Sequence, residues 1–388
     1  MINSDKRTTK PICQLQGLVQ DSWLKDYAIK SKKVKGFDDS QINTAKKSLD
    51  RAFRTIYRAV AFDIDGTLTN HGKVNIRPEM ITIISDLIKK GVHIILVTGR
   101  GRTSTFEVAN QIRKGIDLSS WYFRRLRCVT HNGLLVMSTP SSDPKNFLGE
   151  IQFIAKPIPN INNLYEDISK IGSLMQIGKE FKVTKEPSSE PHSIRIVFPN
   201  SVSVDNIESH ISKILPKYSR NDIKLTQTHG TYGVKRSIDI STTTKKRALK
   251  EVAIQLGIKI DQILRIGDQG KIGGNDYDLL NNYCGFSVDE ISSNPDTCHP
   301  VFENDFSKRL TGAEATERLL SQVMLFPPLS LEPPPIERRI KDLYAFERIA
   351  VIRAREEYNK TLKGMRDLLQ KHFSIPLKKL PGANEPVA

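Results

Sequence analysis

The chain has 388 residues, of which 38% are hydrophobic, 7% aromatic and 26% charged, so it can bury the core of one large or two ordinary domains. No apolar run approaches the ~18 residues that a membrane-spanning helix needs, which excludes a membrane protein of the helical kind. The 59 Lys and Arg against 43 Asp and Glu give a net charge of +16, which attracts polyanions and phosphorylated metabolites.

The residue composition also indicates the compartment and the partners of the protein. The four cysteines are widely spaced, form no CxxC pair and are typical of a reducing compartment: Cys13, Cys128, Cys284 and Cys298. The first ten residues are polar and basic and show no secretory signal, so we expect a cytoplasmic protein. Nucleic acid stays an alternative partner on charge alone, although no basic stripe interleaved with aromatic residues supports it.

The chain divides by composition into an N-terminal extension, an α/β region, a proline-rich segment and a C-terminal extension. The α/β region alternates short apolar runs with helical patterns, which is typical of a parallel sheet. Five prolines in the segment FPPLSLEPPP predict a stiff linker, because proline has no amide hydrogen to donate. The charged C-terminal extension has helical spacing and predicts a helix that packs on its own domain or serves a partner or a second copy. The boundaries are 1–57, 58–325, 326–335 and 336–388, with N-terminal helices expected over Leu18–Ile29 and Gln41–Ile56.

Within the α/β region, the elements follow from apolar periodicity and from glycine and Asn-Gly turn signals. The first part predicts a strand over Ala59–Ile64, a helix over Arg77–Lys90, a strand over His93–Thr98 and a strand–turn–strand over Arg127–Met137. The last part predicts a strand over Ser237–Ser241, a helix over Lys245–Leu256 and a strand over Gln262–Ile266.

The strongest chemical signal is the sequence Asp63-Ile64-Asp65-Gly66-Thr67 at the end of the first strand. Two carboxylates two residues apart can share one cation while one attacks an electrophile and the other transfers a proton. Gly66 permits a backbone turn that a side chain would obstruct.

Three further pieces stand at the ends of later elements. Thr98 and Gly99 end the second strand, where a hydroxyl and backbone amides can hold phosphate oxygens. A lysine begins a later helix, and Lys245 and Lys246 both qualify. Acidic residues beside glycines then follow the last strand and suit a hard, oxygen-loving cation: Asp268, Asn275 and Asp276.

Together, in this order, the four pieces resemble the haloacid dehalogenase-like superfamily over residues 58–324. The resemblance implies Asp63 as nucleophile and Asp65 as general acid/base. It implies phosphate binding by Thr98, Gly99 and Lys245. The implied Mg²⁺ ligands are Asp63, the backbone carbonyl of Asp65, and Asp268, with Asn275 and Asp276 in support.

The long separation of Thr98 from Lys245 indicates an inserted domain. Its pattern is similar to the type-IIB α/β caps of Cof-type phosphatases, sucrose-phosphate phosphatases and phosphomannomutase. We expect strands over Ile151–Ala155, His192–Phe198 and Asp222–Gln227 and helices over Leu164–Met175 and Val204–Leu215 in this cap. The expected fold is therefore α/β, with a Rossmann-like doubly wound parallel-sheet core (58–138 and 237–325), an inserted α/β cap (139–236) and mainly helical N- and C-terminal extensions.

These features predict an Mg²⁺-dependent phosphohydrolase that acts through an aspartyl-phosphate on a small phosphorylated metabolite, with a sugar phosphate favoured. One alternative is a phosphomutase with the same nucleophile, which would need a second phosphate site in the cap. The other is a nucleic-acid-associated phosphatase or scaffold that uses the basic extensions. We expect Arg100, Arg102 and Lys271 to be ordinary surface charges, although each is placed to face an anionic substrate.

Overall fold

The computed structural model describes residues 21–322, except for residues 56, 71–72, 117–119, 141–142, 144, 188–190, 219–222, 230–234 and 304–305. All of these described residues belong to one compact unit of the chain. The proline-rich segment and the C-terminal extension lie outside the described residues. Among the helices that are described, none is both long and apolar enough to cross a membrane.

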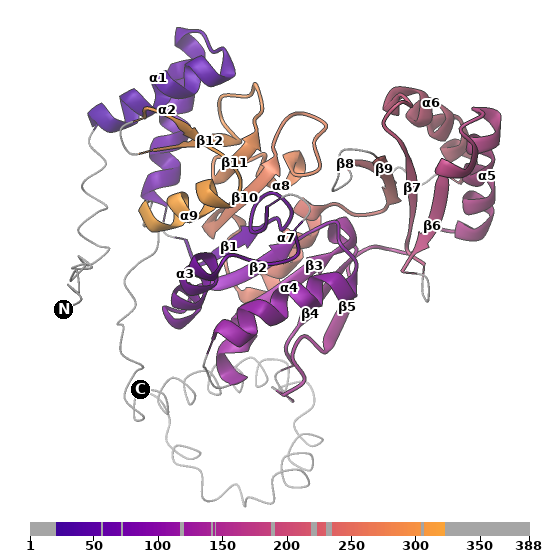
Figure 1. Ribbon diagram of the computed structural model, residues 1–388, viewed down its shortest axis with the longest axis horizontal. Coiled ribbons are helices and arrows are strands. Elements are labelled where there is room, and N and C mark those ends of the chain that lie inside the picture. The colour runs from indigo at the N-terminus through magenta and orange to yellow at the C-terminus, as the bar shows by residue number, and fades with distance from the viewer. Residues whose placement is uncertain are drawn as a thin grey trace, which may run out of the picture. The chain divides into compact units, whose positions relative to one another are not determined.

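The larger sheet is the framework of the fold (Figure 1). Nine strands of the described chain form it, in the order β13-β12-β11-β10-β1-β2-β3-β4-β5. The strands from β12 to β3 are parallel, while β4, β5 and β13 are antiparallel to their neighbours. Their bounds are β1 Ala59–Phe62, β2 His93–Val97, β3 Leu126–Thr130, β4 Leu135–Ser138, β5 Glu150–Phe153, β10 Ile263–Gln269, β11 Gly285–Glu290, β12 His299–Phe302 and β13 Arg309–Leu310.

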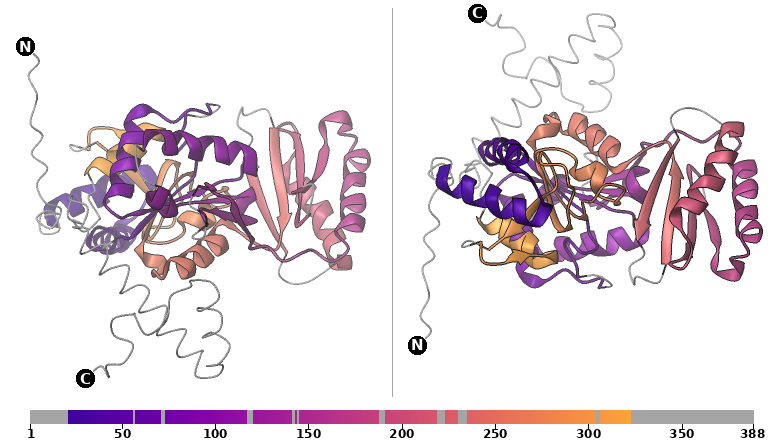
Figure 2. Two further views of the ribbon diagram at one scale, coloured as in Figure 1. Left: turned by 90° about the horizontal axis from the view of Figure 1, so that it is seen from below. Right: turned by 90° about the horizontal axis from the view of Figure 1, so that it is seen from above.

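Helices cover both faces of this sheet (Figure 2), because its central strands are apolar on both sides. In β1, Val60 and Phe62 pack into one cluster while Ala59 and Ala61 pack into the other, and all four side chains are fully buried. The first cluster includes residues of α3 (Pro78–Lys89), α4 (Arg102–Gly115) and α9 (Gly312–Gln322), and the second includes residues of α7 (Lys245–Leu256) and α8 (Tyr277–Leu280). This arrangement confirms the predicted doubly wound α/β core.

A second, smaller sheet lies in the inserted segment and has helices on one face only. Its four antiparallel strands have the order β6-β7-β9-β8, with bounds β6 Lys182–Glu186, β7 Ser193–Pro199, β8 Lys224–His229 and β9 Lys235–Ser241. Apolar residues of β7 and β9, such as Ile196 and Ile238, pack beneath α5 (Ile161–Leu174) and α6 (Val204–Ile214). The alternate residues of these strands therefore form a helix-free face.

Two strands join different sheets from those the sequence predicted. Ile151–Ala155 was expected in the cap, but β5 pairs with β4 at the edge of the large sheet. Ser237–Ser241 was expected in the core, but β9 lies between β7 and β8 in the small sheet. The expectations were wrong because local apolar patterning specifies a strand but not the strand it pairs with.

The N-terminal segment forms a helical hairpin that packs on the core. Helix α1 (Asp21–Lys35) and helix α2 (Asp39–Arg54) are joined by a turn in which Asp38 caps α2 through the backbone amide of Gln41. Their aromatic side chains meet those of the sheet: the ring of Phe53 lies 5.1 Å from Trp23 and 6.1 Å from Phe286. This hairpin is therefore part of the hydrophobic core.

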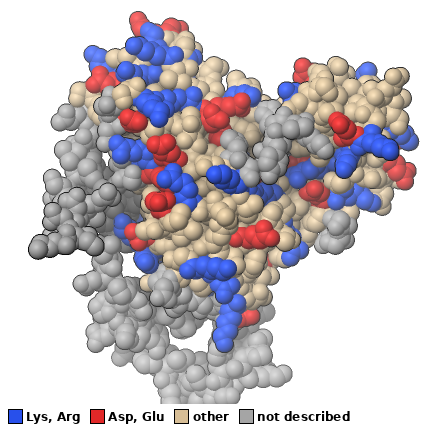
Figure 3. Space-filling view, viewed as in Figure 1, with Lys and Arg blue, Asp and Glu red and all other residues tan. Residues whose placement is uncertain are grey.

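Basic and acidic side chains are mixed on the surface. On the face drawn in Figure 3, Lys and Arg lie among Asp and Glu rather than in one continuous stripe over the described residues. The alternative of a nucleic-acid partner stays a prediction.

Candidate active site

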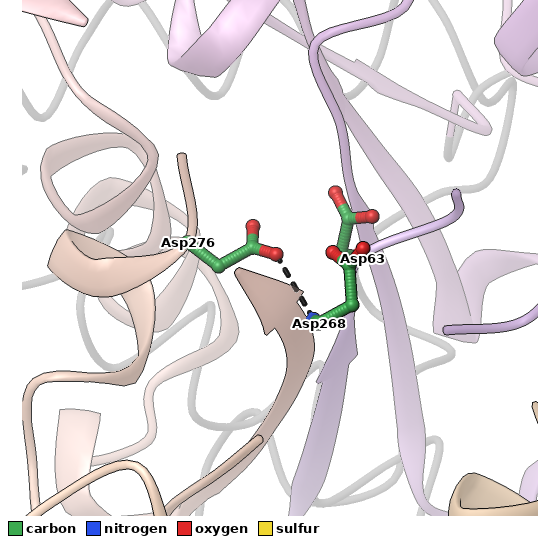
Figure 4. A group of neighbouring side chains, drawn as sticks. All are labelled: Asp63, Asp268 and Asp276. Atoms are coloured by element: carbon green, nitrogen blue, oxygen red, sulfur yellow. Dashed lines mark hydrogen bonds between the residues drawn. The ribbon is translucent and has the colours of Figure 1, made fainter. Parts of the chain in front are cut away.

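Asp63 directly follows β1, and Asp268 lies near the end of the adjacent parallel strand β10. In the pairing of β1 with β10, Phe62 lies opposite Ile266, and the backbone amide of Asp63 donates to the carbonyl of Ile266 at 2.8 Å. Parallel register thus brings the two carboxylates to the same edge of the sheet, where α/β folds bind their ligands. Figure 4 shows Asp63 and Asp268 side by side, with Asp276 facing them from the loop before α8.

These three carboxylates form a compact buried group. One oxygen from each lies within 4.8 Å of the others, and Asp63, Asp268 and Asp276 are 4%, 2% and 0% exposed. Burial and the carboxylate of Asp276 raise the pKa of Asp63 to about 8, against the opposing effect of Lys245. Burial and the carboxylates of Asp276 and Asp63 raise the pKa of Asp268 well above its usual range. The group therefore carries more negative charge than its protein surroundings neutralise.

Lys245 is the cation of this group. Its Nζ donates to Asp63 Oδ1 at 2.8 Å and to Asp276 Oδ1 at 2.7 Å, and the residue is 2% exposed. Burial alone would lower the pKa of this ammonium, but the two carboxylates raise it above its usual value. Thr244 caps α7 by accepting from the amide of Arg247, which fixes where the helix begins. Of the two candidate lysines, Lys245 is the one whose ammonium contacts the carboxylates.

Asp276 is held by several donors at once. Its Oδ2 accepts from the backbone amides of Asp268 at 3.1 Å and Gln269 at 3.2 Å, while Oδ1 accepts from Lys245. Although burial alone would raise the pKa of Asp276, Lys245 and these hydrogen bonds hold it below its usual value. A Cβ on Gly267 would lie 2.8 Å from this carboxyl group, so only glycine fits there. Both oxygens of Asp276 thus accept hydrogen bonds from the protein. This arrangement suits a residue that supports the metal ligands rather than one that binds the ion itself.

Asp65 lies beside the group but has a different partner. Arg100 grips its carboxylate with two hydrogen bonds, Nε to Oδ2 at 2.9 Å and Nη2 to Oδ1 at 2.5 Å. This hydrogen bonding raises the pKa of Arg100. Gly66 follows with φ +75°, which is the turn that the sequence required. Arg100 was expected as a surface charge, but its guanidinium is 14% exposed and holds the second aspartate of the motif.

Thr98 and Gly99 follow β2, the strand next to β1. Thr98 is 1% exposed, and its hydroxyl accepts from the backbone amide of Arg100 at 3.1 Å. Gly99 lies against Asn132, whose Oδ1 would be 3.0 Å from an added Cβ. Two other predicted surface charges are placed as expected: Arg102 is exposed, and Lys271 pairs with Glu290 at 2.6 Å.

The group fits a divalent cation. Asp63 and Asp268 supply hard oxygen donors, and their raised pKa values reflect negative charge that a cation would neutralise. Asn275 adds a side-chain oxygen, Oδ1, that is buried without a hydrogen-bond partner among the described residues. The residues that would hold Mg²⁺ are therefore present together.

The cap contributes residues that sequence reasoning missed. Arg195 of β7 donates to both carboxylate oxygens of Asp239 on β9, at 2.7 and 3.0 Å, and to the carbonyl of Gly99 at 3.0 Å. Glu186 of β6 contacts His131 of the core. Each is a charged residue within a strand. Its sequence context does not distinguish it from a surface charge, and only its position on the helix-free face shows that it contacts the core.

Comparisons with known proteins give one family model and several solved structures that this chain resembles. A family model described as haloacid dehalogenase-like hydrolase matches residues 60–143. A mutant of Plasmodium falciparum IMP-nucleotidase with IMP bound has a TM-score of 0.51 at 13% identity over 78% of this chain and 77% of that chain. The ATP-bound form of that protein gives 0.49 at 14% identity over 83% and 78%. A structure from a phosphoryl-transfer superfamily, described for a trigonal-bipyramidal intermediate, gives 0.41 at 17% over 60% and 87%.

At these identities the likeness to solved structures concerns the fold alone. A search of the curated proteins found no match.

Proposed function

We propose that this chain is a haloacid dehalogenase-like hydrolase, as the family model over residues 60–143 indicates, and that it is an Mg²⁺-dependent phosphohydrolase with Asp63 as its nucleophile. The observation that carries the proposal is the buried meeting of Asp63, Asp268 and Lys245 at one edge of the sheet. A phosphate monoester is dianionic and repels a carboxylate, so a phosphatase of this kind needs cations placed around its nucleophile.

Asp63 would attack phosphorus in line with the leaving oxygen. A bond forms between the carboxylate oxygen and phosphorus as the bond from phosphorus to the substrate oxygen breaks. Lys245 would stabilise charge on the phosphoryl oxygens, together with the hydroxyl of Thr98 and the backbone of Gly99. Asp63, the backbone carbonyl of Asp65, and Asp268 would hold Mg²⁺, which when bound neutralises negative charge on the phosphoryl group.

Asp65 would act as the general acid/base. It protonates the departing substrate oxygen and then accepts a proton from the water that hydrolyses the aspartyl-phosphate, which releases inorganic phosphate and restores Asp63. Arg100 holds the Asp65 carboxylate with two hydrogen bonds, so Asp65 would leave this contact and take up a proton before it acts as the acid.

The helix-free face of the cap supports a sugar phosphate as substrate. Contacts with Gly99 and Asn132 place this face toward the core. In register across its strands lie Thr184, Arg195, Asp239 and Thr226. The hydroxyls of Thr184 and Thr226 suit a leaving group rich in hydroxyls, because each buried hydroxyl needs a hydrogen-bond partner.

A screen of phosphorylated metabolites for release of inorganic phosphate, with and without Mg²⁺, tests the proposal. We expect release from a hexose phosphate in the presence of Mg²⁺, no release after chelation, and no release by Asp63→Asn. Normal turnover by Asp63→Asn would contradict the assignment of the nucleophile. Isomerisation of a hexose phosphate without free phosphate would favour the mutase instead.

A further inference from the structure

A turn formed by His131, Asn132 and Gly133 lies between the two segments that carry the phosphate-binding candidates. The three residues have consecutive positive φ angles of 50°, 55° and 98°. Asparagine and glycine tolerate this left-handed region better than other residues. Asn132 is 3% exposed. A buried left-handed turn of this kind is held by specific contacts on every side.

On one side, the turn is bonded to the segment after β2. The amide of His131 donates to the carbonyl of Arg100 at 2.9 Å, and the amide of Asn132 donates to the carbonyl of Thr98 at 3.0 Å. These bonds bracket Gly99, and the side chain of Asn132 packs against it. The turn therefore fixes the path of the chain through Thr98. The hydroxyl of Thr98 accepts from the backbone amide of Arg100.

On the other side, the turn touches the beginning of α7. A Cβ on Gly133 would lie 2.4 Å from the carbonyl oxygen of Thr244 and 3.0 Å from the backbone nitrogen of Lys245. The backbone of the turn thus rests directly on the residues that place the Lys245 ammonium. One turn consequently sets the spacing between the Thr98 and Lys245 segments.

The cap is joined to the same turn. The side-chain amide of Asn132 donates to Asp239 Oδ2, and Asp239 in turn accepts two hydrogen bonds from Arg195. Arg195 also donates to the carbonyl of Gly99, which closes a ring of contacts around the turn. Asp239 is 4% exposed and Asn132 3%, so the contact between them is shielded from water.

We propose that Asn132 is a positioning residue that ties the cap, through Asp239, to both phosphate-binding segments of the core. This inference rests on the proposed function, since it assigns Thr98 and Lys245 to the phosphoryl group. The Asn132–Asp239 contact then couples the position of the cap over the substrate to the spacing of the groups that bind phosphate. A displacement of about 1 Å in such groups costs on the order of 10²-fold in rate.

An exchange of the two side chains tests the proposal. N132D keeps the shape and the tolerance of positive φ but sets one carboxylate against another, so the contact becomes repulsive. The double variant N132D/D239N restores an amide and a carboxylate at this contact with their places exchanged, and it keeps the net charge of the wild type. N162D is the matched control, because Asn162 is exposed on the cap and accepts a hydrogen bond from Lys185.

We expect N132D to lower kcat for p-nitrophenyl phosphate, in the presence of Mg²⁺, by about 10- to 100-fold while KM changes less than about threefold. The double variant should recover part of that loss, because D239N leaves only one oxygen to accept the hydrogen bonds of Arg195, and N162D should match the wild type. A kcat within about twofold of wild type in N132D would overturn the proposal.

Amide hydrogen exchange gives a second measurement that does not need turnover. The amides of His131 and Asn132 should exchange about tenfold faster in N132D and return toward wild type in the double variant. Unchanged exchange in a folded N132D would also overturn the proposal. A wild type that releases phosphate from no substrate contradicts the proposed function instead, and the exchange rates then decide the positioning role.

Discussion

Removal of the Lys245 ammonium probes the electrostatics of the site most sharply. In Lys245→Met, Asp63 and Asp276 lose hydrogen bonds of 2.8 and 2.7 Å from a cation that is almost completely buried. Breaking a buried ion pair by removing one partner costs about 3–5 kcal/mol, because the remaining charge is uncompensated. Here two carboxylates lose the shared cation, so we expect a loss of stability toward the upper end of that range.

The loss should depend on pH in a definite direction. In the wild type, Lys245 helps hold the pKa of Asp276 below its usual value; without this ammonium, burial raises that pKa above the value of the unfolded chain. The folded protein then binds more protons than the unfolded chain, so stability falls as pH rises through the folded pKa. The difference between Lys245→Met and wild type should accordingly be larger at about pH 8 than at about pH 5.

Urea denaturation of the metal-free proteins at both pH values measures this difference, with Lys246→Met as the matched control. Lys246 is the adjacent lysine and does not supply the ammonium of the site. A Lys245→Met protein within about 1 kcal/mol of Lys246→Met at the higher pH would refute the reasoning, since surface changes stay within about 0.5 kcal/mol.

Three further outcomes are expected. Burial lowers the pKa of Lys35, which donates to the carbonyl of Thr297, to about 7, so wild-type stability should gain over Lys35→Met as pH rises from about 7 to 10 in urea titrations. Phe53→Ala should cost about 3–5 kcal/mol in the same assay, whereas an unchanged midpoint would mean that the hairpin does not pack on the core. Mg²⁺ should raise the melting temperature more at about pH 8 than at about pH 6, because ligation requires deprotonated Asp63; an equal shift at both would contradict the metal site.

The sequence predicted the family resemblance, the doubly wound core and an enzyme, and all three are confirmed. It could do so because each motif follows a strand whose apolar pattern is unambiguous, and parallel strands deliver their ends to one edge. Asp63 and Asp268, distant along the chain, were expected together for that reason and lie together. The catalytic roles of these residues stay predictions.

Other features depend on pairings that a sequence does not display. The partners of β5 and β9 are set by packing across the whole sheet, so the patterns of these strands could not locate them. Arg195 and Asp239 are ordinary charged residues until register places them opposite each other and beside Asn132. The Asn132-Gly133 turn was visible in the sequence, but its contact with the start of α7 was not.

A crystal structure of the protein with Mg²⁺ and beryllium fluoride, which mimics a phosphoryl group on a carboxylate, tests the central claim most directly. The proposed chemistry predicts beryllium fluoride attached to the carboxylate of Asp63 and an ion ligated by both Asp63 and Asp268. An adduct on another residue, or an ion bound away from these two strand ends, would contradict it.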